Sequence, residues 1–108
     1  MRVDSFAKEM NLTVLTEAGD AEIRDVCIGD LLSIVMNTCS EGSLWITQQT
    51  HPNILQVASL SDAAAIVIPA EAGVEQSLID KAEDMGVCLL SSELGIYELA
   101  WRTHEVLK

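Results

Sequence analysis

A run of uncharged hydrogen-bonding side chains occupies the middle of the chain. It follows Leu44 to Thr47, which have the composition of a buried strand, and Pro52 suits the first turn of a helix because its missing N–H needs no partner there. Ligands of parallel α/β sheets bind beyond the carboxyl ends of strands, where helix N-termini attract anions. We therefore expect a site for a small anionic metabolite or nucleotide, with candidate residues Thr47, Gln49, His51 and Asn53.

Asp30 and Ser33 are two further candidates, at the start of an apolar helix expected over residues 31–38. The alternative to ligand binding is helix capping. Asp30 is a good N-cap for the helix that follows it, and Thr50 and Asn53 could cap the next helix while the glutamines face solvent. Further along, we expect a serine at position 91 or 92 to cap the last helix and the acidic residues between 71 and 84 to form a solvated face.

Catalytic and metal-binding patterns are absent from the sequence. His51 could act as a general base, since imidazole titrates near neutral pH, but no serine or cysteine partner is identifiable. There is no GxxxxGK[ST] phosphate loop, GxGxxG, HExxH or calcium loop. Cys27, Cys39 and Cys88 form no CxxC, and we expect them to be small buried hydrophobes in a reducing compartment. We assign no catalytic residue, no metal and no cofactor, and we do not expect an enzyme.

Composition narrows the class of partner. The chain has 108 residues, 49% hydrophobic and 21% charged, and a formal net charge of −11. Such an acidic chain is a poor ligand for nucleic acid or an anionic membrane, whose binding needs concentrated positive charge. We see neither a signal peptide nor a membrane span and expect a cytoplasmic protein. The acidity favours solubility or docking to a basic partner.

Hydrophobic periodicity predicts one α/β domain over residues 1–108. From residue 44 onward the pattern is β-α-β-α-β-α, which predicts a mostly parallel central sheet. The first half is less regular and leaves antiparallel strands open. Helices are expected at 4–10, 31–38, 52–60, 75–84 and 93–107, strands at 12–15, 23–28, 44–47, 64–68 and 87–90, and a turn at 17–20.

The helix expected over residues 31–38 is apolar on nearly all sides, through Leu31, Leu32, Ile34, Val35 and Met36. A helix of this kind is either deeply packed or part of a subunit interface, so we expect a homodimer. Trp45 and Trp101 are expected to be core or interface anchors, since large aromatic side chains bury much area.

From Gly42 to its end, the chain resembles the DRTGG domain. The matching segments are Trp45–Thr47 before the signature loop, Ile54–Leu60 after it, and the strands Ala65–Ile68 and Gly86–Ser91. Upstream, Asp30-Leu31-Leu32-Ser33 and the spaced series Gly42, Trp45, Thr47, Gln49, His51, Asn53 are similar to small standalone members. The signature Asp-Arg is replaced at about His51-Pro52, and its Thr-Gly-Gly at about Pro69-Ala70-Glu71.

The resemblance implies a fold like the N-terminal domain of HPr kinase/phosphorylase and a regulatory or ligand-binding role without established catalysis. The leading hypothesis is therefore a non-catalytic regulatory module that binds a small anionic ligand at residues 47–53. The alternative is a protein-interaction subunit that docks on a partner enzyme without a small-molecule ligand.

Overall fold

The computed structural model describes residues 1–17 and 21–108. Its elements follow one another in the predicted order, and each lies within a few residues of its expected position. The helices are α1 (Val3–Glu9), α2 (Leu32–Thr38), α3 (Asn53–Leu60), α4 (Gln76–Met85) and α5 (Ile96–Leu107), and the strands are β1 (Thr13–Val14), β2 (Asp25–Ile28), β3 (Ser43–Ile46), β4 (Ala65–Ile68) and β5 (Leu89–Ser91). A turn was expected at residues 17–20, and residues 18–20 of it lie outside the described residues.

The described strands form one sheet in the order β1-β5-β4-β3-β2. Strands β2, β3, β4 and β5 are mutually parallel, and β1 joins the far edge antiparallel to β5. The prediction of a mostly parallel α/β sheet is thus confirmed. Because these parallel strands point the same way, the segments after β2, β3, β4 and β5 all lie at the same end of the sheet, where the strands have their carboxyl ends.

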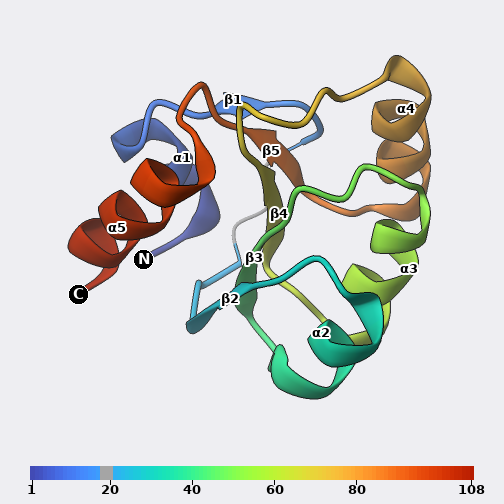
Figure 1. Ribbon diagram of the computed structural model, residues 1–108, viewed down its shortest axis with the longest axis horizontal. Helices are drawn as coiled ribbons and strands as arrows, with labels where there is room; N and C mark the ends of the chain where they lie inside the picture. The colour runs from blue at the N-terminus through green and yellow to red at the C-terminus, as the bar shows by residue number, and fades with distance from the viewer. Residues whose placement is uncertain (18–20) are drawn as a thin grey trace.

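Helices cover both faces of the sheet. Figure 1 shows α1 and α5 together on one side, and α2, α3 and α4 on the other. Alternate residues of each strand feed the two cores: Leu44 and Ile46 pack with Phe6 and Leu99 on the first side, whereas Trp45 packs with helices α2 to α4 on the second. Strands β3 and β4 are buried along their whole length, as expected of strands covered on both faces.

The N-caps of α2, α3 and α5 differ from the expected residues. The N-caps of α1 and α2 are Arg2 and Leu31, and neither makes a side-chain capping bond. The prediction of Asp30 as N-cap was therefore wrong. At α3 the N-cap is Pro52, not Thr50 or Asn53. At the C-terminus of α4, Gly86 has a φ of 71° and closes the helix in the left-handed conformation that glycine tolerates.

The cysteines also depart from expectation. Cys27 in β2 and Cys39 after α2 form a disulfide with their Cα atoms 5.5 Å apart. The expectation of reduced thiols was wrong for this pair because the edge strand and the returning helix end bring the two residues together. Cys88 is buried in the core beneath α1 and α5, as expected.

No helix within residues 1–17 and 21–108 is both long enough and apolar enough to cross a membrane.

Candidate functional site

Asp30 connects the ends of two parallel strands. Its Oδ1 accepts hydrogen bonds from the Thr47 hydroxyl at 2.9 Å and from the Gln48 backbone N–H at 2.7 Å. Asp30 thus follows β2, yet it binds the first residues of the loop after β3. Such bonds to a carboxylate are stronger than neutral ones. Asp30 and Thr47 were both predicted as site residues, and the structure brings them together.

Gly29, the residue before Asp30, also makes hydrogen bonds to β3 through its backbone. Its N–H donates to the Ile46 carbonyl at 3.2 Å, and its carbonyl accepts from Trp45 Nε1 at 2.9 Å. Helix α2 packs closely above it, since a Cβ on Gly29 would lie 3.3 Å from Val35 Cγ2. The position of Asp30 is therefore fixed by its neighbour on β3 and by the helix that follows.

The loop over residues 47–53 is built from short local hydrogen bonds. Thr47 is fully buried, and its Oγ1 accepts from the Gln49 N–H at 3.1 Å. At the other end, His51 Nδ1 accepts from the Asn53 N–H at 3.1 Å, a position that an anion at a helix N-terminus would take. The side chains of Gln49, His51 and Asn53 are exposed.

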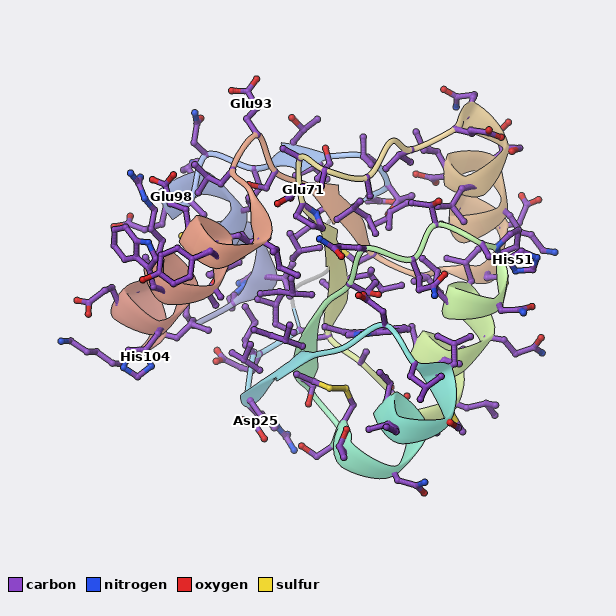
Figure 2. The ribbon with its side chains drawn as sticks, in the orientation of Figure 1. Asp25, His51, Glu71, Glu93, Glu98 and His104 are labelled. Atoms are coloured by element: carbon purple, nitrogen blue, oxygen red, sulfur yellow. A yellow bond between two sulfur atoms is a disulfide. The ribbon has the colours of Figure 1, made fainter. Side chains whose placement is uncertain are left out.

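The six predicted residues therefore divide into an inner and an outer group. Asp30 and Thr47 form the inner bond, whereas the other four face solvent. Figure 2 shows His51 at the outer margin of the α3 layer, pointing away from the sheet. Ser33 lies in the first turn of α2, where its backbone carbonyl accepts from Asn37 Nδ2 at 3.0 Å.

Glu71 was not predicted as a functional or positioning residue. Both of its carboxylate oxygens lie 3.0 Å from the Ile96 N–H at the start of α5. It thereby does the work expected of a serine cap, although Ser92 Oγ does accept the Leu94 N–H at 2.9 Å within the same loop. The sequence places Glu71 just beyond a strand, but it does not indicate that this carboxylate faces the start of α5, whose N-cap is Gly95.

Two aromatic side chains lie on the outer face of α5. Tyr97 is 82% exposed and Trp101 is 46% exposed, so Trp101 is not a core residue, in contrast to the buried Trp45. The guanidinium of Arg102 lies 5.4 Å from the centre of the Trp101 ring and also pairs with Glu98 at 2.6 Å. The sequence indicates this arrangement, because two aromatic residues four positions apart lie on the same face of a helix.

The polar side chains at this end of the sheet make hydrogen bonds to the backbone. The His51 ring bonds to a backbone amide, and the carboxylates of Asp30 and Glu71 each accept backbone N–H groups. Within the described ranges, no group of three or more His, Cys, Asp or Glu side chains could hold a metal ion. What the loop offers a ligand is a set of exposed amide and imidazole groups on a fixed backbone.

Comparison with known proteins supports the fold. No family model matches the chain, and no curated protein matches it. Among solved structures, it is similar to the CBS and DRTGG domains of the regulatory region of Clostridium perfringens pyrophosphatase, in complex with the activator diadenosine tetraphosphate, with a TM-score of 0.70 and 9% identity. The match covers 94% of this chain and 45% of that one, so this chain spans less than half of its neighbour. The likeness shows a DRTGG-like α/β fold.

Proposed function

We propose that this protein is a non-catalytic regulatory module that binds a small anionic metabolite or nucleotide at residues 47–53. The observation that carries the proposal is the Asp30 link to Thr47 and Gln48. It holds the start of the loop backbone in place, so this part of the backbone needs little ordering when a ligand arrives. A preordered site loses less entropy on binding.

The position of the loop gives the second argument. It joins the carboxyl end of β3 to the N-terminus of α3, where backbone dipoles favour negative charge. The His51 ring now accepts the Asn53 N–H, and a phosphate or carboxylate oxygen could replace it there. The structural neighbour is a regulatory region crystallised with a nucleotide activator, which makes nucleotides the first class to test.

A thermal-shift screen of adenine nucleotides, diadenosine tetraphosphate, acyl phosphates and sugar phosphates tests this proposal. A ligand at 100 times its dissociation constant is expected to stabilise the fold by about 2.7 kcal/mol, which raises Tm by roughly 10 °C in a domain of this size. His51→Ala and Asn53→Ala are each expected to remove most of that shift because they remove groups that would contact the ligand.

His104→Ala is the matched control, since His104 is an exposed histidine on α5, across the sheet. It should keep the full shift. A ligand whose shift survives unchanged in both loop variants binds elsewhere, and a panel without any shift removes the proposal.

The second candidate function is a protein-interaction subunit that docks on a partner enzyme without a small-molecule ligand, and a homodimer is a separate proposal. Contact with another protein chain is favoured by the exposed apolar side chains at α2, here called the α2 surface: Leu31, Ile34 and Met36, which are 61%, 56% and 42% exposed. Helix α2 carries no charged residue, so it offers a partner no charge to desolvate. A second copy of the chain, rather than a basic partner, suits such an uncharged surface.

Ile34→Asp should convert the dimer to a monomer in sedimentation at about 100 μM, because a specific dimer is well populated at that concentration. Tyr97→Asp is the control, an equally drastic change at an exposed side chain on the opposite layer. A wild-type protein that sediments as a monomer refutes the dimer. Docking of the acidic surface to a basic partner would instead weaken as salt is raised.

A further inference from the structure

The disulfide closes a covalent ring around one corner of the molecule. Cys27 lies in β2, the outermost parallel strand, and Cys39 directly follows α2, 12 positions further along the sequence. The ring contains Gly29, Asp30 and all of α2. It therefore includes both the residue that holds the 47–53 loop and the α2 surface.

Helix α2 has few other attachments. It has seven residues, no side-chain cap and no charged residue in its first or last turn. Val35 is its buried side chain, with Leu32 half-buried beside it, and the rest of the helix is exposed. Helices this short are marginal in water and depend on tertiary contacts. Besides this packing, the Cys27–Cys39 bond is the covalent restraint on the end of α2.

The surroundings of the two sulfurs suit thiols as well as a disulfide. Each cysteine is about nine-tenths buried, in a cluster that includes Val35 and Trp45. The Thr38 hydroxyl donates to the Ile34 carbonyl at 2.9 Å and lies 3.9 Å from Cys27 Sγ. After reduction, that oxygen can accept the Cys27 S–H. The reduced pair would remain as small buried hydrophobes, so the fold can survive in both states.

We propose that Cys27 and Cys39 form a reversible thiol–disulfide switch that sets the order of α2 and, through Asp30, of the 47–53 loop. The reductant is a dithiol. Its thiolate attacks one sulfur, the Cys27–Cys39 bond breaks through a mixed disulfide, and the second thiol of the reductant then displaces the protein. Two electrons and two protons pass to the protein, leaving two thiols, and the dithiol becomes a disulfide. The proposal goes beyond ligand binding and stands whether or not the loop binds one.

The full chain is compared in its oxidised form and after dithiothreitol, with differential alkylation and peptide mass spectrometry reporting on Cys27 and Cys39. Hydrogen exchange then follows the backbone amides. On reduction, amides of residues 29–39 and the Gln48 N–H are expected to exchange at least about tenfold faster, because the ring no longer restrains them. Amides of α4 and α5 should keep their rates. Reoxidation with glutathione disulfide should restore the starting pattern.

The Cys27→Ser, Cys39→Ser double variant controls for effects of the reductant itself. Its amides should exchange at the rates of the reduced protein, and dithiothreitol should not change those rates. The proposal is overturned if residues 29–39 and 48 exchange equally in both states of the wild type. It is also overturned if the pair stays oxidised under dithiothreitol without denaturant, or fails to re-form with glutathione disulfide.

Discussion

Trp45→Ala is expected to lower the free energy of unfolding by about 3–5 kcal/mol, the range for removing a fully buried large aromatic side chain. A single domain has only about 5–15 kcal/mol in total, so the variant should be close to unfolding at 37 °C. Urea denaturation followed by far-UV circular dichroism measures the change, which should appear in the midpoint rather than in the slope.

The size of this effect follows from where Trp45 lies. It is 1% exposed, its Cα is paired in register with Cys27 on one side and Ile66 on the other, and it fills the core beneath α2 and α3. Its Nε1 donates to the Gly29 carbonyl at 2.9 Å. Removing the indole leaves a cavity and also leaves a carbonyl without its partner at the corner before Asp30.

Two further variants separate these contributions. Trp45→Phe keeps most of the ring but not the N–H, and should lose about 1–3 kcal/mol, mainly from the unpaired Gly29 carbonyl. Trp101→Ala removes the same side chain from a half-exposed position on α5 and should change stability by under about 1 kcal/mol. Equal losses at positions 45 and 101 would contradict the packing described here.

The order of the elements could be predicted because it depends on local periodicity. Ala65–Ile68 is a short, continuous apolar run, and α4 shows one apolar face that includes Leu78 and Ala82. These patterns need no knowledge of distant residues. Helix α2 shows the limit of the method: its apolar composition indicated burial or an interface, but only the structure shows that Ile34 and Met36 remain exposed on either side of buried Val35.

The connections that position the candidate site could not be predicted in the same way. Asp30 bonds to a residue 17 positions away and Glu71 to one 25 positions away, whereas capping rules consider only neighbours in sequence. Each acid was placed correctly beyond its strand, but its partner depended on how the parallel strands align. The disulfide has the same origin, since it needs β2 at the sheet edge and the end of α2 folded back beside it.

The second large effect is expected at Asp30. Asp30→Ala removes the acceptor for the Thr47 hydroxyl and the Gln48 N–H, and hydrogen bonds to a charged group contribute about 1.5–3 kcal/mol each. Water can replace the acceptor at exposed Gln48 but not at fully buried Thr47. We therefore expect a loss of about 2–4 kcal/mol in urea unfolding, with faster hydrogen exchange at Gln48 and Gln49.

A double-mutant cycle with Thr47→Val tests whether the loss comes from this bond. Valine has nearly the shape of threonine, and replacing both partners of a buried hydrogen bond with apolar groups is close to neutral. The double variant Asp30→Ala, Thr47→Val should therefore be more stable than the sum of the single losses predicts, by about 1–2 kcal/mol of coupling. Additive losses would mean that the Asp30–Thr47 bond contributes no stability and that Asp30 holds the loop after β3 through the Gln48 N–H alone. The buried half of the link on which the proposed binding site depends would then be absent.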